Sequence, residues 1–229
     1  MFKLLDGITA LKAGLTVEDQ QAFAKLALGQ SPDVTFFGCS DSRLEPIVSA
    51  SKEPGSVFVN RNIGNLIPPN GATVATPESA STLAVIEYAL TQLNVSYIIV
   101  CGHSGCGAMQ ALWNSTSFPE APHLEAWLEH GRKSLERLKQ EPGVVLDKEL
   151  SPQNQLSQVN VLQQLDHLQC HPLVSKRLEA GALQLYGWWF EIATASVHSF
   201  DEETRSFLLI EEEHAARIRK RAATVRKHA

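Results

Sequence analysis

Residues 98–109 read IIVCGHSGCGAM, and this stretch decides the fold class. Together with Tyr97 it begins as an apolar run, which ends abruptly in a glycine-rich segment that carries His103 and Cys106. Apolar runs of this length are typical of buried strands, and glycine lets the chain turn tightly after them. The stretch therefore predicts a buried strand that delivers two reactive side chains to a turn before a helix.

Two shorter apolar runs precede this strand. Val34–Phe37 reads VTFF and Val57–Val59 reads VFV, and proline and glycine punctuate both runs. A helix is predicted between the second and third runs, at about residues 77–93, from apolar side chains at helical spacing. Strand, helix and strand in this order favour a right-handed crossover and a parallel sheet. The expected fold class is α/β, with a central, mostly parallel β-sheet flanked by helices.

Further helices and strands are predicted before and after these three strands. Phe2–Ala13 forms an amphipathic helix, and Thr16 caps a second one that ends at Gly29; we expect both to pack on the core or on a partner subunit. Later elements are helices at 123–140 and 153–168 and strands at 183–192 and 205–210. Residues 1–210 are expected to form a single domain. Residues 211–229 are expected to form a charged, partly basic tail, which reads as a solvated or frayed terminal helix.

The composition and charge of the chain exclude several classes of protein. The chain has 229 residues, 44% of them hydrophobic, which suits one globular domain. A net charge of -5 argues against a nucleic-acid partner, and no apolar run approaches the roughly 20 residues that span a bilayer. Four cysteines are too few for a disulfide framework, and the two that lie outside the motifs, Cys101 and Cys170, are expected to be core residues. The N-terminal stretch lacks the pattern of a signal peptide. We therefore expect a cytoplasmic protein with no membrane partner.

Reactive side chains follow two of the predicted strands. The first strand leads into CSDSR, with Cys39, Asp41 and Arg43, and the third leads to His103 and Cys106. Ligands gather outside the carboxyl ends of strands in an open parallel sheet, so neighbouring strands would bring these groups together. Two thiolates and one imidazole suit tetrahedral zinc, and three protein ligands leave the open position of a catalytic site.

Each of these signals has a simpler interpretation when it is taken alone. A His-x-x-Cys pair beside a glycine turn is weak evidence for a metal, and Cys39 is also compatible with a small buried hydrophobe. Asp41 and Arg43, two residues apart, are compatible with a pair that caps the following turn. In the functional interpretation, Arg43 binds the Asp41 carboxylate and keeps it off the metal, so that the carboxylate orients a water molecule instead.

The motifs together resemble a known family. CSDSR, followed about 60 residues later by HSGCG, closely resembles the β-class carbonic anhydrases. The segments EPGSVFVNRNIGNLIPP, IEYAL and LQLYGWWFEI are also similar to that family, so the resemblance covers about residues 1–210. It implies one Zn²⁺ per chain, bound by Cys39, His103 and Cys106, whose hydroxide attacks CO2 to give bicarbonate and a proton. Asp41 and Arg43 match the family's catalytic dyad.

The resemblance also implies a substrate pocket. Gln30, nine residues before Cys39, and the backbone N–H of Gly107 match groups that hydrogen-bond the substrate. Phe58, Ile63 and Tyr88 match an apolar cleft for CO2; without the resemblance we would interpret them as core residues. In the family this cleft lies at a dimer interface, which implies a homodimer or a dimer of dimers here.

Some members of the family are regulated by bicarbonate at a second site built on Trp, Arg and Tyr. The matching positions in this chain are Phe36, Arg61 and Phe190, so only the arginine is retained. The chain therefore resembles the constitutively open subgroup, in which Asp41 pairs with Arg43 near neutral pH. The chain departs from the family at residues 72–81, where glycine-rich sequence is usual, at Asn60, and in the tail.

Other functions remain open at this stage. The same zinc site is also compatible with hydrolysis of CS2 or COS. A non-enzymatic structural zinc module would need a fourth protein ligand. A cysteine-based redox or acyl-transfer enzyme would need a reactive thiolate.

Overall fold

A six-stranded sheet forms the centre of this computed structural model, which describes residues 1–51, 53–69 and 77–225. The strand order is β2-β1-β3-β4-β5-β6; the first four of these strands run parallel, and β5 and β6 join antiparallel. The strands are β1 Val34–Cys39, β2 Val57–Asn62, β3 Tyr97–His103, β4 Gln184–Glu191, β5 Ser196–Asp201 and β6 Ser206–Leu209. The mostly parallel α/β sheet predicted from the sequence is thus confirmed.

Strand β5 is the one element of the sheet that the sequence analysis missed. It reads SVHSFD, so polar residues interrupt it and it lacks an apolar run. It is stabilised by pairing with β4 on one side and β6 on the other. Tertiary pairing therefore makes a strand from a sequence with weak intrinsic β-propensity.

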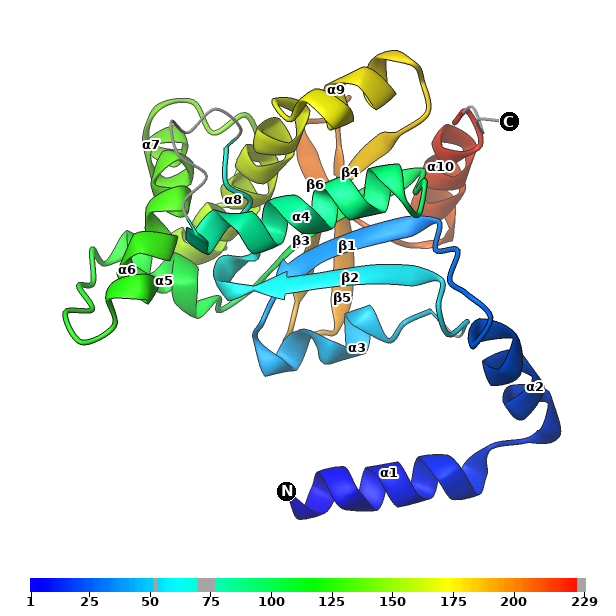
Figure 1. Ribbon diagram of the computed structural model, residues 1–229. Helices are drawn as coiled ribbons and strands as arrows, with labels where there is room; N and C mark the ends of the chain where they lie inside the picture. The colour runs from blue at the N-terminus through cyan, green and yellow to red at the C-terminus, as the bar shows by residue number, and fades with distance from the viewer. Residues whose placement is uncertain (52, 70–76, 226–229) are drawn as a thin grey trace.

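Helices cover both faces of the sheet (Figure 1). Apolar side chains of α4, α8 and α9 pack on one face against Phe37, Ile98 and Val100. Their neighbours in the same strands, Phe36 and Ile99, point to the other face, where α3 and α10 contribute apolar contacts. The helices are α1 Phe2–Gly14, α2 Val17–Leu26, α3 Glu45–Val48, α4 Pro77–Thr91, α5 Gly107–Trp113, α6 Pro122–Leu128, α7 Arg132–Gln140, α8 Pro152–Gln169, α9 Pro172–Glu179 and α10 Glu212–Ala222.

The single helix predicted at 123–140 is wrong, because the chain bends in its middle. Helices α6 and α7 are separated by a 3₁₀ turn, Glu129–Gly131. A Cβ atom at Gly131 would lie 2.5 Å from a Leu112 methyl group, so glycine is required where this bend approaches α5. Glycine also disfavours an uninterrupted helix.

The two N-terminal helices form an arm that reaches away from the sheet (Figure 1). Thr16 caps α2 as predicted: its hydroxyl accepts from the Asp19 backbone N–H, and the Asp19 carboxylate accepts from the Thr16 backbone N–H. No residue of either helix is buried within the chain. The arm's apolar side chains are exposed: Phe2, Leu4, Leu5, Ile8, Leu11, Val17 and Phe23.

Helix α10 forms the described part of the segment that the sequence analysis treats as a tail. It is largely exposed, but one side is anchored to the domain. Arg217 pairs with Asp201 at 2.6 Å, and Ile218 packs against the core. The Tyr97 hydroxyl donates to the backbone carbonyl of Ala222. The boundary at residue 210 stays a prediction.

Among the described residues, no helix combines the length and the apolar character needed to cross a bilayer.

Residues 72–76 of the loop that departs from the family lie outside the described residues, and 77–81 belong to α4.

Candidate metal centre

Adjacent parallel strands place the first two ligand candidates side by side. Strands β1 and β3 pair in a register in which Gly38 faces Cys101, so Cys39 and His103 both lie at the carboxyl edge of the sheet. After β3 the chain turns at Gly105, whose φ of 63° is in the left-handed region that favours glycine. This turn brings Cys106 back over the strand ends, at the start of α5.

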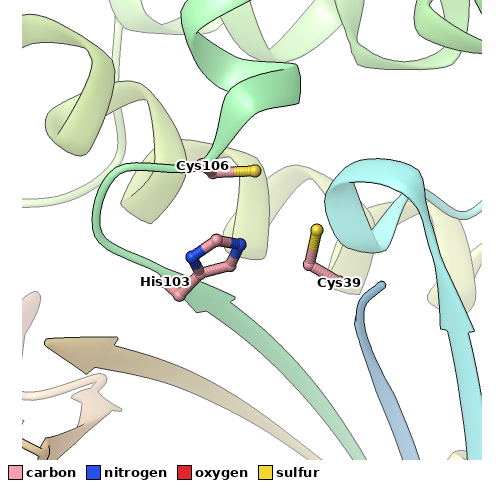
Figure 2. A group of neighbouring side chains, drawn as sticks. All are labelled: Cys39, His103 and Cys106. Atoms are coloured by element: carbon pink, nitrogen blue, oxygen red, sulfur yellow. The ribbon is translucent and has the colours of Figure 1, made fainter. Parts of the chain in front are cut away.

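Cys39, His103 and Cys106 point toward one another (Figure 2). Their ligand atoms all lie within 4.8 Å of one another, and all three side chains are buried. The convergence predicted from the two motifs is therefore confirmed. Among the described residues, this is the only group of three or more His, Cys, Asp or Glu side chains that meets the geometry of a metal site.

The His103 ring has one nitrogen engaged and one without a hydrogen-bond partner. Its Nδ1 lies 2.9 Å from the backbone carbonyl oxygen of Ser104, which can only accept, so Nδ1 carries the proton. Its Nε2 is buried without a hydrogen-bond partner and is then left with a free lone pair. A neutral imidazole nitrogen beside two thiols is the donor set that zinc prefers. The residues present therefore fit a zinc ion.

The two thiols interact strongly with each other. A hydrogen bond from Cys106 lowers the pKa of Cys39 below its usual value. The same interaction, together with burial, raises the pKa of Cys106 well above it. The pair therefore holds one thiolate readily, and a bound cation supplies the charge that the second thiolate needs.

Arg43 engages both oxygens of the Asp41 carboxylate. Its Nε lies 2.9 Å from Oδ1 and its terminal NH2 lies 2.6 Å from Oδ2, and this pair strongly lowers the pKa of Asp41. Asp41 Oδ1 also accepts from the Arg43 backbone N–H, which caps the short turn Ser42–Leu44. Arg43 further donates to the Gly105 carbonyl, 3.0 Å away, so it ties the two ligand-bearing segments together.

A cavity of about 330 Å³ opens at the metal centre beside Cys39. Cys39, Asp41, Ile63 and Gly107 contribute to its wall, so four of the residues singled out from the sequence meet there. A Cβ atom at Gly107 would meet nothing within 4 Å, which is consistent with its position on open space. The rest of the described wall is mainly apolar: Ser40, Ala108, Ala111, Phe118, Leu124 and Leu128.

Comparison with known proteins places this site in a family. The family model described as carbonic anhydrase matches residues 34–197, which includes both ligand-bearing segments. The carbonic anhydrase of Pseudomonas aeruginosa is 33% identical over 214 residues, which is 93% of either chain. The chain belongs to the β-carbonic anhydrases. It is therefore a carbonic anhydrase, an enzyme that interconverts CO2 and bicarbonate.

Solved structures agree with this assignment. The β-carbonic anhydrase CcaA superposes with a TM-score of 0.79 at 35% identity, over 91% of this chain and 98% of the other. Tetrameric β-carbonic anhydrases from Sordaria macrospora superpose with a TM-score of 0.72 at 28% identity, over 86% of this chain and 95% of theirs. The enzyme thus shares its fold with relatives along nearly its whole length.

Three residues predicted for the substrate pocket lie away from the cavity within one chain. Gln30 is exposed before the amino end of β1, whereas Cys39 lies at the carboxyl end. A strand of that length spans roughly 20 Å, so Gln30 does not reach its own metal centre. Phe58 and Tyr88 contact each other, with ring centroids 5.8 Å apart, and neither lines the described cavity wall.

Two residues that contact the ligand-bearing segment were not predicted from the sequence to belong to the metal centre. Arg61 donates to the backbone carbonyls of Cys39 and Asp41, at 2.9 Å and 2.6 Å. The backbone N–H of Gly64 lies 3.4 Å from the Cys39 sulfur. Gly64 has a φ of 77°, and a Cβ there would lie 2.8 Å from the Ala108 methyl. The glycine in the segment NIGN, residues 62–65, was the sequence feature from which this turn could have been predicted.

The two remaining cysteines have different surroundings. Cys101 is fully buried, as predicted for a core cysteine, and burial raises the pKa of its thiol. Cys170 is exposed at the end of α8, so its prediction as a core residue is wrong. Gln169 and Cys170 are exposed at this helix end, whereas Leu168 and His171 beside them are buried.

Proposed function

We propose that the enzyme hydrates CO2 reversibly at one Zn²⁺ per chain, held by Cys39, His103 and Cys106. The observation that carries the proposal is the convergence of three buried ligand atoms beside a largely apolar cavity. Zinc bound there supplies a Lewis acid that ionises water near neutral pH. An apolar wall suits CO2, which has no net charge or dipole.

Asp41 has the role of orienting the attacking water molecule. Its carboxylate faces the cavity and stays ionised, because the hydrogen bonds from Arg43 depress its pKa. Arg43 donates two hydrogen bonds to Oδ1 but only one to Oδ2, so Oδ2 keeps a lone pair that is available to accept a hydrogen bond from water. The same contacts hold Asp41 away from the metal, which supports an open site.

In this proposal Gly107 makes a polar contact with the substrate, and Ile63 makes an apolar one. The Gly107 N–H donates to an oxygen of CO2 as negative charge develops on it. Ile63, 43% exposed in a single chain, provides apolar surface for the uncharged substrate. The proposal assigns binding to both and proton transfer to neither.

A second subunit completes the pocket. Gln30 lies at the far end of β1 from the metal centre of its own chain, and Phe58 and Tyr88 do not line the cavity there; we propose that all three reach the centre of a partner. The exposed apolar side chains of the arm are a suitable contact surface for a homodimer. The tetrameric relatives from Sordaria macrospora support a dimer or a dimer of dimers.

A reducing compartment such as the cytoplasm suits this site. Cys39 and Cys106 have to remain as free thiols to bind zinc, and oxidation of either would remove a ligand.

Stopped-flow CO2 hydration with a pH indicator tests the proposal on protein whose zinc content is assayed. We expect about one zinc per chain and rapid hydration, and we expect Cys106→Ser to lose zinc and most of the rate. Cys170→Ser is the matched control, because this cysteine is exposed and lies outside the centre. Full zinc occupancy without CO2 hydration would contradict the proposal, and the same protein would then be assayed with CS2 and COS.

A further inference from the structure

Helix α8 presents buried polar side chains to the metal centre where an apolar face would be the ordinary arrangement. Ser157, Asn160 and Gln164 are spaced three and four residues apart, so they share one side of the helix. Each is at most 1% exposed. Buried polar groups are costly unless they are hydrogen-bonded. The hydrogen-bond partners of these three side chains, called the polar row below, therefore indicate their role.

The first half of the row contacts the segment that carries two ligands. Ser157 Oγ donates to the backbone carbonyl of His103 at 2.9 Å. One turn earlier, Asn154 Oδ1 accepts from the Gly105 backbone N–H at 2.8 Å. These contacts fix the loop between His103 and Cys106.

The second half of the row contacts the turn after β2. Asn160 Nδ2 donates to the Gly64 carbonyl at 3.1 Å, and Gln164 Oε1 accepts from the Ile67 N–H at 2.8 Å. Gln164 Nε2 donates to Asn160 Oδ1 at 2.9 Å, and the Ser134 hydroxyl donates to the same oxygen at 2.9 Å. The two amides are thereby locked in one orientation and bind the turn at both ends.

The turn has a direct contact with a ligand. The Gly64 N–H points at the Cys39 sulfur, 3.4 Å away, and the Gly64 carbonyl is the group that Asn160 binds. The Gly64 N–H and the Gly64 carbonyl belong to consecutive peptide planes that meet at the Gly64 Cα, where φ is 77° and ψ is 17°. Holding the carbonyl restricts rotation at this Cα, which only glycine adopts readily, and so restricts the direction of the N–H.

We propose that Asn160 and Gln164 are positioning residues for the metal ligand Cys39, acting through the Gly64 turn. The inference rests on the proposed function, because it requires Cys39 to bind zinc. An N–H donated to a thiolate withdraws negative charge from the sulfur, which leaves the metal a stronger Lewis acid. The turn also holds the Cys39 sulfur in place for the metal. Loss of this orientation therefore speeds zinc release, and loss of the charge withdrawal moves the pH midpoint of hydration upward.

Two variants of the network and one control on the same helix test this inference. Asn160→Leu removes the donor to Gly64, and Gln164→Leu removes the acceptor for Ile67. Leu162→Ala is the control: Leu162 is buried on α8 but packs in a separate cluster with Val144 and Val159. The measurements are zinc transfer to a chelator, the thiolate-to-metal absorption band of the cobalt-substituted protein, and the pH profile of CO2 hydration.

We expect both network variants to release zinc about 10- to 100-fold faster than the wild type, with a shifted cobalt band and a higher pH midpoint. Leu162→Ala is expected to lose thermal stability and to keep all three properties. Network variants that match Leu162→Ala in all three properties would overturn the inference. If Asn160→Leu does not fold, Gln164→Leu decides alone. A wild-type protein that binds no zinc would overturn the proposed function as well, whereas normal binding with unaffected variants would overturn only the positioning role.

Discussion

Asp41 takes part in two kinds of contact that the sequence analysis treated as alternatives. Its Oδ1 caps the turn that follows β1, and both of its oxygens are held by the Arg43 side chain. The cap therefore fixes the position of the carboxylate, and the guanidinium fixes its orientation. A residue with a structural role can thus present a functional group with little freedom to move.

Replacing Arg43 should separate these contacts. Arg43→Gln leaves the backbone cap intact but removes the paired hydrogen bonds and the link to the Gly105 carbonyl. The Asp41 carboxylate is then free to turn toward the metal, and we expect CO2 hydration to fall about 10- to 100-fold with zinc retained. Arg219→Gln is the control, because Arg219 pairs with Glu212 on α10, outside the metal centre. Wild-type hydration in zinc-loaded Arg43→Gln would contradict this role for Arg43.

Residues that act through side chains were predictable, whereas residues that act through backbone atoms were not. Cys39, His103 and Cys106 carry their chemistry in the sequence, and two strands sufficed to bring them together. Gly64 contributes only an N–H group, whose direction depends on a turn held by α8. No local pattern encodes a contact between residues about a hundred positions apart.

Elements with strong periodic or apolar patterns were predicted well, and elements that depend on their neighbours were not. Strands β1 and β3 are nearly uninterrupted apolar runs because both faces of the sheet are covered there. Strand β5 contains polar residues and exists through its pairing with β4 and β6. The polar side of α8 was likewise read as an ordinary helix, since its partners lie in other elements.

The carboxylate of Asp201 joins β5 to α10. Its Oδ1 accepts from the backbone and hydroxyl of Thr204, and its Oδ2 pairs with Arg217 at 2.6 Å. The bonds from Thr204, followed by the nearby positive charge of Arg217, lower the pKa of Asp201. A carboxyl group whose pKa is lower in the folded state stabilises the fold above its unfolded pKa of about 3.9. This stabilisation is lost as pH falls through the folded pKa.

Removing the charge of Asp201 should therefore change the free energy of unfolding by an amount that depends on pH. We expect Asp201→Asn to lower the free energy of unfolding by about 1–2 kcal/mol at neutral pH, because it weakens charged hydrogen bonds. The difference from the wild type should shrink as the pH falls below about 4. Urea unfolding at a series of pH values measures it. Glu203→Gln is the control, since Glu203 contacts the same arginine at 3.4 Å but is 86% exposed. A difference that is constant across this pH range would contradict the account of Asp201.

At the scale of the whole molecule, one chain contains the metal centre but only part of the predicted pocket. Ile63 and Gly107 line the cavity, whereas Gln30, Phe58 and Tyr88 do not. The arm formed by α1 and α2 leaves its apolar side chains without cover in the single chain. The sequence could indicate an amphipathic arm, but the surface that covers it belongs to another molecule in the proposed assembly.

The arm should therefore control both assembly and activity. Ile8→Glu combined with Leu11→Glu places charge on two apolar residues of α1 that are 54% and 63% exposed. If a partner subunit covers them, burying these carboxylates is strongly unfavourable, and we expect a smaller species in analytical ultracentrifugation. CO2 hydration should fall with it, because the groups proposed to come from the partner are withdrawn. Lys3→Glu, an exposed change on another side of α1, is expected to alter neither property.

The two measurements distinguish the possible failures. A double variant that keeps its oligomeric state would show that α1 lies outside the interface. A dissociated variant that keeps full hydration would show that each chain builds a complete pocket, and Gln30, Phe58 and Tyr88 would then have no substrate role. Loss of both properties, with zinc still bound, is the outcome that the geometry favours, because the metal ligands Cys39, His103 and Cys106 all come from one chain.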